Sequence, residues 1–258
     1  APGAGKSTLV DQLAREYRKQ GKTVGIIAVD PTSPYTGGAI LGDRIRMSGH
    51  YADPGIYIRS MATRGSLGGL ARTTADVASV MDASGRDVIL IETVGVGQDE
   101  VDIVRLAEVT VVILVPGMGD DVQTIKAGIM EIADVFVINK SDRDGAERVE
   151  REIRAMQSLS VRKDEWVPPV VKTVASDGQG IDQLASAIGS YQEFLGKSDI
   201  GRQKRVQNWR ERLIEMLRDS LLERVMKDQD GRVDAYASEI AEHKRDPYSL
   251  VEELVGKK

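Results

Sequence analysis

The first eight residues combine glycines, a lysine and two hydroxyl side chains at a spacing that suits phosphate chemistry. They read A-P-G-A-G-K-S-T, which follows the pattern G-x-x-x-x-G-K-S/T from its second position onward. Gly3 and Gly5 let backbone N–H groups turn toward phosphate oxygens, and Lys6 adds a positive charge that reaches the β- and γ-phosphates. The hydroxyl of Ser7 is an oxygen ligand of the kind that Mg²⁺ binds. The residues expected to hold phosphate are Pro2, Gly3, Ala4, Gly5, Lys6, Ser7 and Thr8.

A second signature, N-K-S-D, follows the apolar run V-F-V-I and resembles the N-K-x-D guanine signature of GTPases. The carboxylate of Asp142 can accept hydrogen bonds from N1–H and the 2-amino group of guanine, and adenine offers neither donor. Two charge-assisted bonds of about 1.5–3 kcal/mol each would favour guanine by two orders of magnitude or more. We expect Asn139 to tie the base loop to the phosphate loop and the Lys140 stem to lie over the base. Ala175 stands where GTPases place a second base loop, although Val174 replaces the usual serine before it.

Three carboxylates fall at strand ends or in the loops that follow them. Asp30 closes the run I-I-A-V-D, Asp43 lies in G-D-R-I-R-M, and Glu92 closes V-I-L-I-E. The carboxyl ends of parallel strands meet in the crevice where open α/β sheets bind ligands. Because Mg²⁺ prefers oxygen ligands and keeps several waters, we expect a metal site formed by Ser7, Asp30, Asp43 and Glu92.

The segment after Glu92 reads T-V-G-V-G-Q and has the composition of a mobile switch. Gly95 and Gly97 allow the backbone to approach the γ-phosphate and to move when it leaves. We assign Gln98 or a nearby backbone group to orient the attacking water. The residues expected in catalysis are Lys6, Asp30, Asp43, Glu92 and Gln98. Position alone offers four candidates for a transition-state arginine: Arg44, Arg46, Arg64 and Arg143.

These motifs need a scaffold of alternating strands and helices. Five β-branched runs read as buried parallel strands, at 23–30, 87–92, 109–115, 134–139 and 170–174. Five segments between them have helical spacing, at 7–20, 67–83, 100–107, 146–159 and 181–195. This alternation predicts the α/β class: a P-loop fold with a mainly parallel sheet flanked by helices.

The last sixty residues have a different pattern, because no strand-like run remains after residue 199. Helical spacing covers 203–227, 233–243 and 247–254. We therefore expect a P-loop core over 1–198 and an all-helical C-terminal arm over 199–258. The arm is either a solvated helical face or a surface that packs on another subunit or partner protein. Since the phosphate motif opens the chain, we expect its preceding strand to lie outside this sequence.

Composition excludes several other kinds of function. The chain of 258 residues contains no cysteine and two histidines, which excludes disulfides and thiolate zinc sites and disfavours imidazole metal sites. A net charge of −5 and an aromatic content of 4% argue against a nucleic-acid partner. No apolar run approaches the roughly 20 residues of a membrane span and no signal peptide opens the chain, so we expect no membrane partner and a cytoplasmic location.

Six segments occur in the order found in the MeaB/ArgK/MMAA group of GTPases. They are A-P-G-A-G-K-S-T, A-V-D-P-T-S-P, G-D-R-I-R-M, T-R-G-S-L-G-G-L-A, E-T-V-G-V-G-Q and N-K-S-D. The chain resembles this group from residue 1 to about 195, with plausible continuation through the helical tail. The second and fourth segments separate this group from Ras-like and signal-recognition GTPases.

The resemblance implies a homodimeric GTPase that uses Mg²⁺, takes GTP to GDP and holds no tightly bound organic cofactor of its own. It implies a chaperone that gates adenosylcobalamin loading onto an acyl-CoA mutase such as methylmalonyl-CoA mutase, and that protects or reactivates this enzyme. It also implies that the C-terminal arm forms the dimer and that an N-terminal helical extension, expected outside this sequence, belongs to the fold. By position, the loop 115–123 matches a third switch that signals to the mutase, with Gly117, Gly119, Asp120, Asp121 and Gln123 as its expected residues.

Three other readings compete with this one. A P-loop fold also permits a phosphotransferase that passes the γ-phosphate to a protein or a small molecule. A nickel-inserting GTPase would need soft or imidazole ligands, which this composition lacks. A non-enzymatic partner would use nucleotide only to hold a shape. The sequence does not distinguish among the acyl-CoA mutases that could be served.

Overall fold

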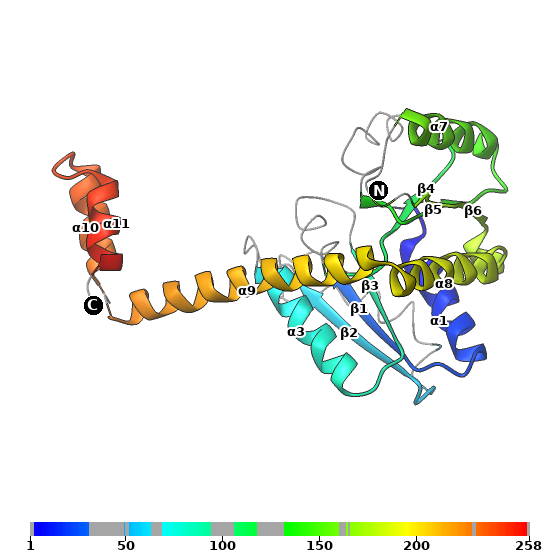
Figure 1. Ribbon diagram of the computed structural model, residues 1–258, viewed down its shortest axis with the longest axis horizontal. Coiled ribbons are helices and arrows are strands. Elements are labelled where there is room, and N and C mark those ends of the chain that lie inside the picture. The colour runs from blue at the N-terminus through cyan, green and yellow to red at the C-terminus, as the bar shows by residue number, and fades with distance from the viewer. Residues whose placement is uncertain are drawn as a thin grey trace. The chain divides into compact units, whose positions relative to one another are not determined.

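The chain forms two compact units, Ala1–Arg202 and Gln203–Lys258. The computed structural model describes residues 3–30, 49, 52–62, 69–93, 106–117, 132–159, 164, 166–228 and 231–256. The division falls within the first turns of helix α9 (Asp199–Asp228), close to the limit that the sequence suggests. Figure 1 shows the strands and most of the helices in the first unit, and two short helices at the end of the second.

Six described strands form two three-stranded parallel sheets. The first sheet has the order β2-β1-β3, and the second has the order β4-β5-β6. The strands are β1 (Val24–Asp30), β2 (Ile56–Ala62), β3 (Val88–Glu92), β4 (Val111–Leu114), β5 (Val135–Asn139) and β6 (Val170–Thr173). Five of them match the strands expected from the β-branched runs.

Strand β2 is an element that the sequence did not indicate. Its residues I-Y-I-R-S-M-A alternate in exposure, with Tyr57 and Arg59 exposed between Ile56, Ile58 and Met61. This alternation is typical of a strand with one solvated face, and β2 lies at the edge of its sheet. An edge strand therefore lacks the continuous apolar run that marks β1 or β5.

Helices cover both faces of the sheets, because successive residues of each strand point to opposite sides. Helices α1 (Lys6–Lys19) and α8 (Ile181–Lys197) pack together on a core that takes residues from strands of both sheets. On the opposite face, α3 (Gly69–Ala83) packs on β1 and β2, and α7 (Ala146–Leu159) packs on β5. The expected class, a parallel sheet flanked by helices, is confirmed (Figure 1). The helix expected over 100–107 lies mostly outside the described residues.

The second unit is helical throughout its described residues. Helix α9 is followed by α10 (Arg232–Ala241) and α11 (Pro247–Gly256), and these two pack around the buried side chains of Tyr236 and Leu250. The carboxylate of Glu253 on α11 accepts hydrogen bonds from Arg232 and Tyr236 on α10. The three helices expected from the sequence are therefore present.

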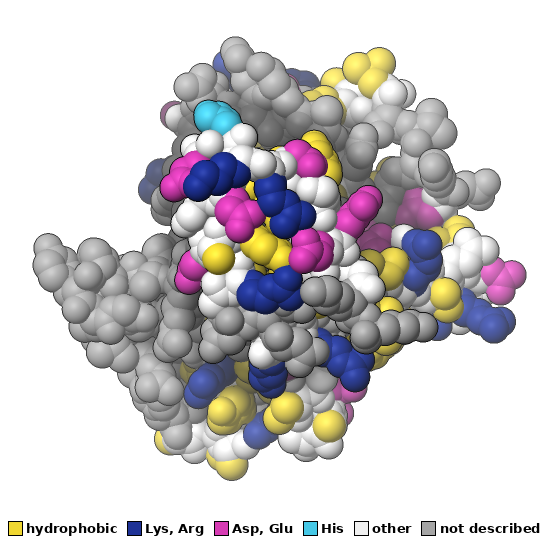
Figure 2. All heavy atoms as spheres, turned by 90° about the vertical axis from the view of Figure 1, so that its left-hand side faces the viewer, with side chains coloured by type: hydrophobic (Ala, Val, Ile, Leu, Met, Phe, Trp, Pro, Cys, Tyr) yellow, Lys and Arg dark blue, Asp and Glu magenta, His cyan; other side chains and the backbone are white. Residues whose placement is uncertain are grey.

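The charged side chains are mixed by sign on the visible face of the molecule. Figure 2 shows acidic and basic side chains of the described residues interspersed on this face around a few hydrophobic ones. Among the helices that the structure describes, none is both long enough and apolar enough to cross a membrane.

Candidate nucleotide-binding site

The phosphate loop leads directly into the N-terminus of α1. Gly3 and Gly5 have φ angles of 77° and 81°, in the left-handed region that glycine adopts without strain, and α1 begins at Lys6. A Cβ atom on Gly5 would lie 2.5 Å from Nδ2 of Asn139, so the position also lacks room for a side chain. The backbone N–H groups of the first helical turn and the helix dipole make this end of α1 an anion site.

Asn139, at the end of β5, joins three segments of the chain. Its side chain is 2% exposed, and its Nδ2 donates a hydrogen bond of 2.9 Å to the carbonyl oxygen of Ala4 in the phosphate loop. Its Oδ1 accepts bonds of 3.1 Å from the hydroxyl of Thr173 and from the backbone N–H of Ala175. The tie between the base loop and the phosphate loop, expected from the sequence, is therefore present in the structure.

Lys140 makes a second connection between the same two loops. Its Nζ donates a 2.8 Å hydrogen bond to the carbonyl oxygen of Gly3. Its backbone φ of 56° is unusual for a residue with a side chain and costs on the order of 1 kcal/mol or more. A turn closed by the bond from Arg143 N–H to the Lys140 carbonyl oxygen follows at once. The strain is consistent with a functional position, because it directs the lysine stem across the mouth of the site.

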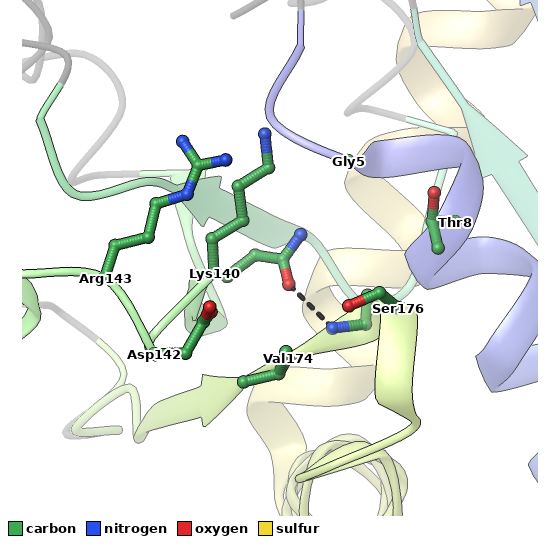
Figure 3. Close-up of a pocket in the computed structure, with 9 residues that line it drawn as sticks. Gly5, Thr8, Lys140, Asp142, Arg143, Val174 and Ser176 are labelled. Carbon is green, nitrogen blue, oxygen red and sulfur yellow. Dashed lines mark hydrogen bonds between the residues drawn. The ribbon is translucent and has the colours of Figure 1, made fainter.

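The two loops enclose one cavity of about 250 Å³, near the lower end of the size range of small-molecule sites. Figure 3 shows Asp142, Lys140 and Arg143 on one side of it and Val174 and Ser176 on another, with Gly5 and Thr8 from the phosphate loop and α1. The residues that line it are Gly5, Thr8, Asn139, Lys140, Asp142, Arg143, Val174, Ala175 and Ser176. A ligand in this cavity contacts both the phosphate loop and the N-K-S-D corner.

Two of the four expected metal ligands lie together at the other end of the phosphate loop. The hydroxyl of Ser7 donates a 2.6 Å hydrogen bond to Oε1 of Glu92, which is 7% exposed at the end of β3. A hydroxyl and a buried carboxylate are the hard oxygen donors that Mg²⁺ selects, so these residues fit the ion. Asp30 ends the neighbouring strand β1, two positions beyond the residue that pairs with Glu92. No group of three or more acidic or histidine side chains gathers at a metal distance among the described residues.

Several expected site residues lie outside the described part of the chain. They are Pro2, Asp43, Gly95, Gly97, Gln98, Gly119, Asp120, Asp121 and Gln123, together with the side chain of Asp30. Gly117, the first glycine of the expected third switch, is described and has a φ of 89°. It follows Pro116, whose side chain would contact a Cβ placed on Gly145 at 3.8 Å. The start of this loop therefore lies beside the segment that leads from the N-K-S-D corner into α7.

Sequence reasoning did not assign Val174 and Ser176 to the base pocket, which they line, nor Thr173 and Arg143. Thr173 holds Asn139 by its hydroxyl, and the register of β5 and β6 pairs these two residues directly. Arg143, considered only as a candidate transition-state arginine, lines the cavity beside Asp142. A signal for Thr173 was available, because it ends a strand parallel to β5 and precedes the expected second base loop.

The chain is a P-loop nucleotide-binding protein. Three features define this class: a parallel sheet covered by helices, a glycine-lysine loop at a helix N-terminus, and an N-K-S-D corner on the same cavity. The family model described as "Methylmalonyl Co-A mutase-associated GTPase MeaB" matches residues 1–230, so the chain belongs to this family. It is a GTPase, as its relatives are named.

Two relatives and one solved structure show how close the likeness is. A putative GTPase of Pyrococcus abyssi is 50% identical over 99% of this chain and 81% of its own length. The GTPase ArgK of Escherichia coli is 37% identical over 89% of this chain and 70% of its own length. The crystal structure of an LAO/AO transport system kinase superposes with a TM-score of 0.68, at 27% identity over 98% of this chain and 78% of that one.

Proposed function

We propose that this GTPase is a chaperone for an adenosylcobalamin-dependent acyl-CoA mutase of the methylmalonyl-CoA mutase type. In this role it gates cofactor loading and protects or reactivates the mutase. The family match carries the proposal, because the family description names association with methylmalonyl-CoA mutase and the match covers most of the chain. The position of Pro116 beside Gly145, in the segment that follows the N-K-S-D corner, supports it, since a partner bound at the loop that starts there would lie close to the nucleotide.

The base is read by the N-K-S-D corner. Asp142 accepts from N1–H and the 2-amino group of guanine, and the Lys140 stem covers the base. Asn139 positions this corner against the phosphate loop through its bond to Ala4, and Ala175 contributes a wall of the cavity. Because Asn139 holds both loops, binding of the base and binding of the phosphates support each other.

Hydrolysis takes place at the anion site of α1 by in-line attack of water on the γ-phosphorus. Lys6 and the N–H groups of residues 3–8 bind the phosphate oxygens and stabilise the charge that develops on the transferred group. Ser7 and Glu92 would hold Mg²⁺, with Asp30 and Asp43 assigned to its water shell and Gln98 to the attacking water. When bound, the ion neutralises charge on the β- and γ-phosphate oxygens.

The second unit serves as a dimerisation arm that binds the same unit of another copy. Helix α9 carries large apolar side chains that are about half exposed or more, including Trp209 at 55%, Leu213 at 53% and Leu217 at 61%. Contiguous apolar surface of this kind is typical of an interaction site. A symmetric pair of arms would remove these side chains from water.

The test is a loading assay with purified methylmalonyl-CoA mutase, in which transfer of adenosylcobalamin is followed by its absorbance. We expect GTP turnover to be low for the GTPase alone and to rise when the mutase is added, and we expect loading to depend on the nucleotide. Lys6→Ala should reduce hydrolysis by about 10²–10³-fold, since it removes a charge that stabilises the transition state. Turnover that is fast from the start and unaffected by the mutase would contradict the chaperone role.

A phosphotransferase is the second candidate, because the similar solved structure is titled a transport system kinase. Incubation with GTP labelled at the γ-phosphate separates the two functions. The chaperone proposal predicts that all label appears as inorganic phosphate. Label transferred to a protein or a small molecule would instead support the kinase.

A further inference from the structure

We propose that Arg143 is a nucleoside-binding residue, whose guanidinium group covers the guanosine part of the bound nucleotide. This inference rests on the guanine site proposed above. It also separates Arg143 from catalysis: the residue contributes affinity equally to GTP and GDP and does not act on the γ-phosphate.

The position of Arg143 in the cavity carries the proposal. Arg143 lies on the same side of the cavity as Lys140 and Asp142 of the base corner, and Val174 and Ser176 line another side (Figure 3). The cavity reaches the phosphate loop at Gly5 and the start of α1 at Thr8, whereas Lys6 and Ser7, which bind phosphate and metal in the proposed mechanism, do not line it. Arg143 is therefore placed to reach the nucleoside, whereas a transition-state arginine has to reach the far end of the phosphates.

The local backbone directs the side chain to this place. The turn that joins Arg143 N–H to the Lys140 carbonyl oxygen sets the two side chains next to each other. Figure 3 shows the Arg143 side chain extending alongside that of Lys140, away from Asp142. Lys140 ends on the carbonyl oxygen of Gly3, so the two side chains run along the wall between the base corner and the phosphate loop.

The guanidinium group is available for a ligand. Among the described residues, no hydrogen bond or ion pair is formed by the Arg143 side chain, which is exposed to solvent at the mouth of the cavity. Two arginines of α7 instead form salt bridges: Arg148 pairs with Glu152, and Arg154 pairs with Glu150. A planar guanidinium stacks on aromatic faces better than an ammonium does, so a purine is a suitable partner.

The test compares Arg143→Ala and Arg143→Lys with the unmodified protein, and Arg148→Ala serves as an exposed arginine control outside the cavity. Dissociation constants are measured for GTP, GDP and guanosine, together with the single-turnover rate at saturating GTP. We expect Arg143→Ala to weaken all three ligands by a similar factor of about five to ten. The single-turnover rate should change by less than about twofold, because the lost interaction is equal in ground and transition states. Arg148→Ala should bind all three as the unmodified protein does.

Arg143→Lys tests whether the guanidinium group stacks on the base, since lysine keeps the positive charge but has no planar group. We expect it to bind nearly as weakly as Arg143→Ala, and full affinity in the lysine variant would contradict stacking. Unchanged guanosine affinity in Arg143→Ala, or a collapse of the single-turnover rate with affinity retained, would overturn the inference. Failure of the unmodified protein to bind GTP would instead contradict the proposed guanine site.

Discussion

A few single side chains fix the geometry of the nucleotide site. Asn139 is the main one, because its buried amide donates one hydrogen bond through Nδ2 and accepts two through Oδ1. A buried amide with partners on three segments fixes their relative positions, since leaving any of its groups unpaired costs about 1–3 kcal/mol.

Asp142→Asn should change the preferred base. The new amide can donate to the 2-carbonyl of xanthine, whereas it cannot accept both donors of guanine. We expect GTP affinity to fall by about 100-fold or more and affinity for xanthosine triphosphate to rise. Competition binding with both nucleotides measures the change, and unaltered GTP affinity would show that Asp142 does not contact the base.

Gly5→Ala should damage the phosphate loop more than backbone strain alone explains. The added methyl would lie 2.5 Å from Asn139 Nδ2, in addition to the strain of a φ of 81°. Gly21→Ala is the matched control, since Gly21 has a φ of 77° and no heavy atom within 4 Å of the added Cβ. We expect the control to lose about 1–2 kcal/mol of unfolding free energy and to keep nucleotide affinity. Gly5→Ala should lose affinity as well, and equal effects of the two changes would contradict the tight contact.

At the scale of elements, α1 connects the phosphate site to the core. Its first residues provide the anion site, while Leu9, Leu13 and Tyr17 bury its inner face against the sheets and α8. Burial raises the pKa of the Tyr17 phenol to about 12. The folded protein therefore keeps this phenol neutral over a range in which an unfolded chain ionises it.

The buried Tyr17 predicts a loss of stability at alkaline pH. Its stabilising effect is complete below pH 10, where both states hold the proton, and is lost as the pH rises toward 12. A shift of this size corresponds to about 2–3 kcal/mol. Tyr17→Phe, followed by urea unfolding between pH 8 and 11, should have a flatter pH profile than the unmodified protein. Parallel profiles would show that Tyr17 ionises normally in the folded state.

The elements differ in how well sequence predicts them. Strands β1 and β5 are buried on both faces and show as continuous apolar runs, and the glycine-lysine and N-K-S-D motifs follow chemical rules of spacing. Strand β2 was missed because one of its faces is solvated. Sequence motifs do not assign Thr173 and Arg143 to the base pocket. The pairing register of β5 and β6 places Thr173 there, and the turn after Lys140 places Arg143.

At the scale of the whole molecule, the first unit contains the nucleotide site and the second exposes a large apolar surface on α9. Exposed apolar side chains are costly for an isolated chain, and burial in the proposed dimer would remove those of α9 from water.

Leu213→Glu should weaken dimerisation, because it places a charge among apolar side chains that are covered in the dimer. Light scattering after size-exclusion chromatography, at about micromolar concentration, measures the mass. Glu215→Gln, two positions away on the same helix, is the control and should remain dimeric. A monomeric unmodified protein, or a Leu213→Glu variant that stays fully dimeric, would contradict the proposed arm.

The central claim is that one guanine nucleotide bridges the phosphate loop and the N-K-S-D corner. The most direct test is a crystal structure with GDP and Mg²⁺. We predict guanine within hydrogen-bond distance of the Asp142 carboxylate and the β-phosphate at the N-terminus of α1, with the ion at Ser7. A nucleotide bound with its base outside the cavity, or with its phosphates away from Lys6, would contradict it.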